Sequence, residues 1–436
     1  MGGSSPTFLR RAGLLESWHI TRNFLGLDSS VLVSARYICA DKTALSKDHL
    51  FFALGKVVEK HPALSVMLQN EDSSPSFIKL EKIELPLVVQ FSDDDLEAAI
   101  QRQLSTRFDT AAELPLWRVA VLPDNTVIFA YHHGIGDGLS GVAFHRSLLA
   151  GLQDVGAASP LIAVPDSLSL LPPIEAMTSL WPSVFKIISE VFSLFIPASW
   201  KRNYYAWNAN PVSKTPQFTP HVKLLTFSGQ EIAAFAKICR SHSATITSAF
   251  YVLAAATLSR FVPSHSPQYK TLGATVAISL RGVAGASEEA ICDYVSGHGS
   301  YPPINPAFQW PAATRYATEL QHQKTAARER LGMIYLISSN IGGFMKAMLG
   351  GKRGATFELS NAGRVPAVDD GGPWRIEQMV FAQSDLVIGA ALKINVIGDP
   401  TGAVNVALTW GEEAIDKEIV DSFATQFQEG LRALLV

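Results

Sequence analysis

Two adjacent histidines and an aspartate, set among glycines, are the residues of this chain best suited to acid–base chemistry. They lie within residues 131–138, which read YHHGIGDG. A neutral imidazole accepts a proton near pH 7, because an unperturbed histidine is already close to its pKa there. The glycines permit tight backbone geometry and leave room for a substrate. We therefore expect a general base in this stretch, with Asp137 fixing the turn through hydrogen bonds or an arginine.

Two other interpretations of the pair His132 and His133 stay open at this point. A metal ion would need a third ligand, and no further cluster of His, Asp or Glu with suitable spacing is evident, so we expect no metal. A purely structural histidine pair is the second alternative. Neither alternative uses the pair as a base.

The HHxxxDG stretch and several other stretches of the chain together resemble a known protein superfamily. The motif HHxxxDG, the tripeptide LWR at 116–118 and the HPAL at 61–64 are similar to the chloramphenicol acetyltransferase superfamily. Residues 357–365, FELSNAGRV, resemble the Ser-Asn-x-Gly stretch of its condensation domains and alcohol acetyltransferases. The resemblance covers the whole chain, and the branch that it resembles most is that of the fungal alcohol acetyltransferases. The DFGWG of the plant acyltransferases does not occur near the C-terminus, so plant acceptor preferences do not carry over.

The resemblance implies a role for each residue of the motif. His133 matches the catalytic histidine and His132 matches the supporting one. Asp137 matches the aspartate that pairs with an arginine instead of touching the catalytic ring. The sequence does not place that arginine, for which there are three candidates: Arg22, Arg36 and Arg281.

Acyl transfer also needs donors for an oxyanion and cations for the phosphates of coenzyme A. The best candidates for the oxyanion are Ser360, Asn361 and the amide of Gly138. For the phosphates, Lys352 and Arg353 lie between glycines in what looks like an exposed basic loop. Without the resemblance, the stretch with Ser360 and Asn361 would be interpreted as a turn, and the stretch with Lys352 and Arg353 as a solvated loop.

These observations predict an acyl-CoA-dependent O-acyltransferase that transfers an acetyl group to a small-molecule alcohol, such as a hydroxyl of a secondary metabolite. No G-x-S-x-G stretch supplies a nucleophile, so a ternary complex is favoured over an acyl-enzyme. Acetyl-CoA or another acyl-CoA would be a co-substrate, with no bound cofactor. The alternatives are an amide-forming or cyclising enzyme of the same fold that acts without acyl-CoA, and a non-catalytic binding protein.

Composition excludes several other classes of protein. The chain has 436 residues, of which 47% are hydrophobic, and can bury a large core without disulfides or metals. With 36 basic and 39 acidic residues and no long charge runs, it lacks the basic face of a nucleic-acid binder. Its three cysteines are far apart in the sequence, as in a reducing compartment. With no apolar stretch typical of a secretion signal, we expect a cytoplasmic monomer.

The elements that must position the motif follow from the hydrophobic pattern, which alternates strands and helices along the whole chain. The motif itself falls at a strand-to-helix turn. Predicted strands are 30–39, 116–122, 126–132, 222–227, 271–280, 388–396 and 404–410. Predicted helices are 50–58, 93–104 with a cap from Ser92, 139–149, 230–240, 244–261, 311–330 and 412–435.

The fold class expected is α/β, with two similar chloramphenicol-acetyltransferase-like lobes around a central tunnel. Residues 1–165 would form the first lobe, which carries HHxxxDG, and residues 218–436 the second, which carries SNAG. Residues 166–217, rich in Pro and Ser, would cross between them.

One apolar stretch lies in this crossover. Residues 180–200 are strongly apolar, but two charges and two prolines interrupt the stretch, so it cannot span a bilayer. It is predicted to be an amphipathic helix that packs on the core or crosses between the lobes. The alternative is a helix that lies weakly on a membrane surface.

Overall fold

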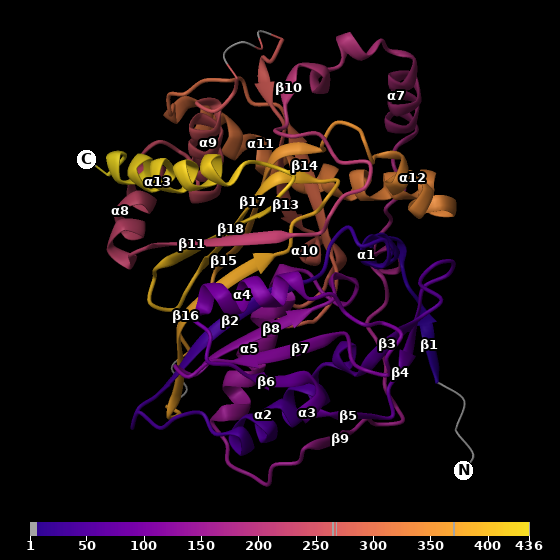
Figure 1. The fold of residues 1–436 in the computed structure, drawn as a ribbon, viewed down its shortest axis with the longest axis vertical. Helices are drawn as coiled ribbons and strands as arrows, with labels where there is room; N and C mark the ends of the chain where they lie inside the picture. Colours follow the sequence, from indigo (N-terminus) through magenta and orange to yellow (C-terminus); the bar gives the residue numbers. More distant parts are fainter. Residues whose placement is uncertain (1–6, 264–265, 267, 369–370, 436) are drawn as a thin grey trace.

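Two mixed sheets, one built mainly from each half of the chain, form the framework of the protein (Figure 1). The computed structural model describes residues 7–263, 266, 268–368 and 371–435. The first sheet has five strands in the order β16 (Trp374–Gln383), β2 (Val31–Cys39), β8 (Thr126–Tyr131), β7 (Trp117–Val121) and β6 (Val89–Phe91). The second has six in the order β11 (Pro220–Phe227), β18 (Val404–Gly411), β17 (Ala390–Gly398), β15 (Ala355–Arg364), β13 (Ala274–Ser279) and β14 (Val295–Ser300).

Strand β16 ties the two halves together. Although it comes late in the chain, it pairs antiparallel with β2, so the orange ribbon of β16 lies beside the indigo ribbon of β2 in Figure 1. A shared core joins the two sheets, with Leu32 and Val380 from the first packing in one cluster with Val222 and Ala407 from the second. The sequence did not indicate β16, whose register is interrupted by a bulge after Ile376. The halves therefore share a sheet.

Most of the predicted elements are confirmed. The strands at 116–122 and 126–132 form the hairpin β7–β8, in which Asn125 takes the left-handed conformation that its turn requires. The hairpin β17–β18 is also confirmed. Short strands complete three small sheets: β1 (Phe8–Arg11), β4 (Ser76–Lys79) and β3 (Val66–Gln69); β10 (Ala206–Trp207) and β12 (Thr271–Leu272); β5 (Lys82–Glu84) and β9 (Leu161–Ala163).

Helices flank both sheets (Figure 1). In the first half they are α1 (Leu14–Phe24), α2 (Lys47–Lys60), α3 (Leu85–Val88), α4 (Leu96–Ser105) and α5 (Gly138–Leu152). In the second half they are α8 (Gly229–Ser241), α9 (Ile246–Ser259), α10 (Arg281–Ala284), α11 (Trp310–Gly332), α12 (Ile341–Ala347) and α13 (Lys417–Ala433). The predicted cap of α4 was wrong: the carboxylate of Asp95 accepts the Ala98 amide at 2.8 Å, whereas Ser92 lies before the helix.

The crossover contains two α-helices, α6 (Ile174–Met177) and α7 (Val184–Phe195), and α7 falls in the apolar stretch. The expected packing of α7 on the core was wrong. Most of its described apolar side chains face solvent, with Phe185 85% and Phe192 66% exposed. Figure 1 shows α7 standing out at the upper edge of the molecule. In the described part of the chain, no helix combines the length and the apolarity needed to cross a membrane.

Candidate active site

The HHxxxDG stretch forms a tight turn between β8 and α5. A single 3₁₀ turn, η2 (His133–Ile135), follows β8. The side chain of His132 caps this turn by accepting the Gly134 amide at its Nδ1 over 2.9 Å. His132 is completely buried, and burial lowers its pKa to about 4. It is therefore neutral at pH 7, and it supports the turn that presents the next histidine.

Asp137 fixes the other end of the turn. As the N-cap of α5, it accepts the amides of Leu139 and Ser140 at 3.1 and 3.2 Å. Its carboxylate also receives the Arg281 guanidinium, with Oδ1 2.6 Å from Nη2 and Oδ2 3.1 Å from Nε. Of the three arginines considered, Arg281 is thus the partner.

The other two candidate arginines are engaged elsewhere. Arg22 is paired with Asp28 at 2.6 Å, and Arg36 with Glu377 at 2.6 Å. Asp137 makes no hydrogen bond to the ring of His133 among the described contacts. Its role is to hold the backbone of the turn against the second half of the chain.

A cavity of about 310 Å³ lies where the two halves meet. The first half contributes walls from α1 and the motif, namely Leu15, Trp18, His19, Arg22, His133 and Gly138. The second half contributes residues of β13 to β17 and of α11. Cavities of this size bind small organic molecules. The motif therefore lines a cavity between the two halves, at the place where a tunnel between lobes was expected.

His133 lies in the wall of this cavity, with 11% of its side chain exposed. Its Nδ1 is buried and has no hydrogen-bond partner within the described chain, so the ring turns its inner edge away from the cavity. Burial, followed by the positive charge of Arg22, lowers the pKa of His133 well below that of an ordinary histidine. The imidazole is therefore neutral at pH 7 and able to accept a proton.

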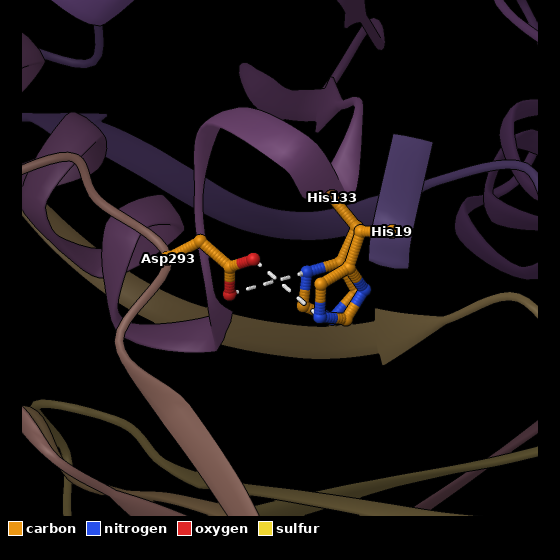
Figure 2. Close-up of side chains that lie close together, drawn as sticks. All are labelled: His19, His133 and Asp293. Atoms are coloured by element: carbon orange, nitrogen blue, oxygen red, sulfur yellow. Dashed lines mark ion pairs between the residues drawn. The ribbon is translucent and has the colours of Figure 1, made fainter. Parts of the chain in front are cut away.

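Two residues that the sequence did not indicate lie against His133. The ring of His19 from α1 stacks on the ring of His133, with centroids 3.6 Å apart and planes inclined by 19°. The carboxyl of Asp293, which precedes β14, faces both rings, with Oδ1 3.7 Å from Nδ1 of His133 and Oδ2 3.4 Å from Nε2 of His19 (Figure 2). The three residues come from segments more than a hundred positions apart, so no local spacing could have revealed the cluster.

This cluster raises the question of a metal, since one nitrogen from each ring and a carboxylate oxygen lie within 4.8 Å of one another. The orientation of the rings does not fit an ion. A nitrogen lone pair lies in the plane of its imidazole, and these two planes are nearly parallel. Their lone pairs therefore lie in two separate, nearly parallel planes and do not converge on a point about 2 Å from both nitrogens, the distance of a metal ligand.

The predicted oxyanion residues lie in different places. Gly138 and Ser360 both line the cavity. Asn361 lies next in β15, where side chains alternate between faces, and its amide donates to Thr247 Oγ1 at 3.0 Å. The structure thus brings Gly138 and Ser360 together with His133 and leaves Asn361 outside.

The basic loop is not the exposed loop that the sequence suggested. Arg353 is only 3% exposed, and its guanidinium donates to the backbone carbonyls of Asn210 and Val387. Lys352 is exposed and donates to backbone carbonyls of the crossover. Neither residue lines the cavity. The prediction that Arg353 is exposed was wrong. Glycines on both sides suggested a solvent-exposed loop, but the Arg353 side chain is buried and its hydrogen bonds link the loop to other segments of the chain.

Comparisons with known proteins identify the family of this chain. A family model described as alcohol acetyltransferase matches residues 11–431. The chain is 22% identical to "Probable alcohol acetyltransferase FCK4" of Fusarium pseudograminearum, over 99% of this chain and 96% of that protein.

Two solved structures share the fold. The trichothecene 15-O-acetyltransferase TRI3 of Fusarium sporotrichioides superposes with a TM-score of 0.70 at 12% identity, over 99% of this chain and 96% of that one. The first condensation domain of the CDA synthetase gives 0.61 at 13% identity, over 100% and 97%. The expected α/β fold of the chloramphenicol acetyltransferase type is confirmed. The chain belongs to the alcohol acetyltransferase family and is an acyltransferase.

Proposed function

We propose that the protein transfers an acetyl group from acetyl-CoA to the hydroxyl of a small-molecule alcohol, with His133 as general base. The observation that carries this proposal is the position of His133: a neutral imidazole in the wall of a cavity between the two halves. A base must lie within reach of the proton that it removes, and it must be unprotonated at the working pH. His133 meets both conditions for a hydroxyl bound in the cavity.

The reaction follows from that placement. Nε2 of His133 removes the hydroxyl proton while the alcohol oxygen attacks the thioester carbonyl carbon and forms the new C–O bond. The carbonyl electrons move onto oxygen, giving a tetrahedral intermediate. When they return, the C–S bond breaks and the thiolate takes the proton from Nε2. The ester and the free thiol leave, and His133 is neutral again.

The intermediate needs hydrogen-bond donors for its oxyanion, each typically worth a few kcal/mol. We assign this role to the hydroxyl of Ser360 and to the backbone amide of Gly138, the first residue of α5, because Asp137 already accepts the amides of Leu139 and Ser140 in the same turn. The first amides of a helix have no partner within it and carry a partial positive charge. Both groups line the same cavity as His133.

The cavity also restricts the acceptor. Besides its polar groups it has apolar walls, among them Trp18, Leu331, Ile334 and Leu386. Apolar walls bind an apolar body through the area that they remove from water. We propose an acceptor with an apolar ring or chain and one reactive hydroxyl, as in many secondary metabolites.

A donor-dependence assay tests this function. Purified protein is mixed with acetyl-CoA and a panel of apolar alcohols, and released thiol and acetylated product are measured together. Equal amounts of thiol and ester, formed only when both substrates are present, would support the proposal. Product that forms at the same rate without any thioester would contradict it and would indicate a cyclising or amide-forming reaction instead.

We further propose that α7 rests on a lipid surface from which apolar acceptors reach the cavity. Its exposed apolar side chains recur at helical spacing and form a single stripe: Val184, Phe185, Ile188, Val191, Phe192 and Phe195. Exposed tryptophans, Trp181 and Trp200, stand at both ends, as at membrane interfaces. The basic residues Lys201 and Arg202 follow Trp200 directly. Within the helix, Lys186 and Glu190 form an ion pair, with Nζ 2.7 Å from Oε1, so their charges cancel. The surface is therefore suited to an anionic bilayer.

The helix is also connected to the cavity. Trp181 stacks on Tyr335 with centroids 4.6 Å apart, and the neighbouring Ile334 lines the cavity. Flotation with vesicles of phosphatidylcholine and phosphatidylserine tests the contact. We expect the protein to float with these vesicles and the variant Phe185→Ser/Phe192→Ser to remain below. Equal flotation of both proteins, or self-association of the wild type in place of flotation, would contradict the proposal.

A further inference from the structure

Asp293 is a buried acid whose carboxyl makes no hydrogen bond to the residues that the structure describes. The side chain has no exposed surface, and neither oxygen has a partner in the described part of the chain. Both oxygens nevertheless face imidazole nitrogens that also lack partners, Nδ1 of His133 and Nε2 of His19 (Figure 2). Buried polar atoms without partners are rare in native proteins and call for an explanation.

The charges around Asp293 are already neutralised by one another. Besides the two histidines, the groups that act on it most strongly are Asp137, Glu16, Arg22 and Arg281. Arg281 is paired with Asp137, Arg22 with Asp28, and Glu16 with Arg10, at 2.6, 2.6 and 2.7 Å. No cation is left to balance a carboxylate at Asp293 among these neighbours. Burial accordingly raises the pKa of Asp293 well above that of an ordinary aspartate.

An uncharged carboxyl has a hydrogen-bonding pattern that suits this position. It carries one O–H donor and one carbonyl acceptor, whereas a carboxylate only accepts. A neutral imidazole likewise has one N–H and one bare nitrogen. The O–H at Oδ2 matches a bare Nε2 of His19, and the carbonyl at Oδ1 matches an N–H at Nδ1 of His133. In that state Nε2 of His133 is bare and free to act as a base.

We propose that Asp293 is a positioning residue that works as a neutral acid, donating to Nε2 of His19 and accepting from Nδ1 of His133, and so holding His133 in the tautomer that catalysis requires. The present separations, 3.4 and 3.7 Å, are slightly longer than hydrogen bonds. Catalytic hydrogen bonds often shorten only when substrate binds.

The motif aspartate holds this arrangement in place. The Asp137 amide donates to the Cys292 carbonyl at 3.1 Å, and its Oδ2 accepts the Tyr294 amide at 3.3 Å. Arg281 also donates to the Cys292 carbonyl, at 3.2 Å. Hydrogen bonds to Cys292 and Tyr294, the residues on either side of Asp293, thus fix its position. Asp137 acts on His133 from a distance, by fixing the segment that carries Asp293.

The inference rests on the proposed role of His133 as base, and two variants of Asp293 test it. Asparagine has the same shape and the same pattern of one acceptor and one donor group toward the two rings. We expect Asp293→Asn to keep kcat within about threefold, and Asp293→Leu to lower kcat about 100-fold with little change in KM, since it leaves the tautomer unset. Asp399→Asn, which alters a buried carboxyl in the β17–β18 turn, is the matched control.

The outcomes separate the alternatives. If Asp293→Asn loses as much activity as Asp293→Leu, a negative charge is required and the neutral acid is wrong. If Asp293→Leu keeps its activity, Asp293 positions nothing. Should the wild type show no acetyl transfer, the proposed function has failed, and the inference must then be judged from the tautomer alone.

A direct reading of that tautomer does not depend on activity. Nitrogen chemical shifts of ¹⁵N-histidine-labelled protein distinguish a protonated from a bare ring nitrogen. We expect His133 to carry its proton on Nδ1 in the wild type, Asp293→Asn and Asp399→Asn, and to show mixed tautomers in Asp293→Leu. A proton on Nε2 in the wild type would overturn the inference. An unchanged tautomer in Asp293→Leu would also overturn it, and would point to the backbone carbonyl of His133 as the group that holds the Nδ1 proton.

Discussion

Asp137 and Arg281 join the two halves of the chain through a doubly hydrogen-bonded ion pair, with Oδ1 2.6 Å from Nη2 and Oδ2 3.1 Å from Nε. Both side chains are almost fully buried, at 4% and 2% exposure. The same guanidinium also donates to the carbonyls of Ser287 and Ala290. The pair therefore organises the segment that leads to Asp293 as well as the HHxxxDG turn.

Removal of one partner of the Asp137–Arg281 ion pair should destabilise the protein. In Asp137→Ala, Arg281 stays buried without a counter-ion, so we expect the free energy of unfolding to fall by about 3 to 5 kcal/mol. Urea unfolding followed by circular dichroism measures the loss. Asp421→Ala breaks exposed ion pairs with Lys223 and Lys417 and should cost less than about 1 kcal/mol. Similar losses in the two variants would contradict a structural role for the buried pair.

Gly138 must be a glycine because β16 leaves no space for a side chain. A Cβ at this position would lie 2.8 Å from the Phe381 ring, which itself lines the cavity. Gly138→Ala should therefore displace the start of α5 and lower kcat about 10- to 100-fold. Gly55→Ala in α2, where a Cβ would meet nothing within 4 Å, should leave kcat unchanged. Full activity in Gly138→Ala would show that the contact with Phe381 is not restrictive.

Buried histidines should make the fold sensitive to mild acid. Burial lowers the pKa of His61, His132 and His145 to about 4. Between pH 6.5 and 4 the unfolded chain binds protons that the folded chain excludes, so stability is full above pH 6.5 and falls as the pH decreases. Each histidine should cost about 2 kcal/mol at pH 5. Unfolding free energies measured at pH 7 and 5 test this, and equal values would contradict it.

The pH profile of the reaction should reflect the environment of His133. Because burial lowers its pKa, the base remains unprotonated at pH values where an ordinary histidine is charged. Activity is lost only when His133 becomes protonated, so the acid limb of kcat/KM should have its midpoint below about pH 6.5, the ordinary histidine value. The profile is measured over the range in which the protein stays folded. A midpoint above 6.5 would mean that a different group limits the rate.

The sequence predicted those parts of the fold and site that depend on neighbouring residues. Alternating and helical apolar patterns indicated most strands and helices, and HHxxxDG indicated the turn between β8 and α5. Glycines flanking Arg353 suggested exposure, but the residue fastens the loop to backbone carbonyls inside the protein. Alternation along β15 separates Ser360 from Asn361, which a dipeptide match cannot show.

What the sequence did not reveal depends on contacts between distant segments. Arg281 is 144 positions from Asp137, and Asp293 reaches His133 only because β14 and the motif turn meet between the halves. His19 lies on α1, a helix that the hydrophobic pattern did not predict. The pairing of β16 with β2 likewise follows from the closure of the whole fold, because no short-range turn connects them.

The kcat of a His133 variant tests the role of this residue most directly. His133→Ala is compared with the wild type in the acetyl-CoA and alcohol assay, and urea unfolding confirms that both proteins are folded. We predict that kcat falls by about 10²- to 10⁴-fold, the usual contribution of a general base, while KM for the alcohol changes little. A folded His133→Ala protein whose kcat stays within about threefold of the wild type would contradict the assignment of His133 as the base.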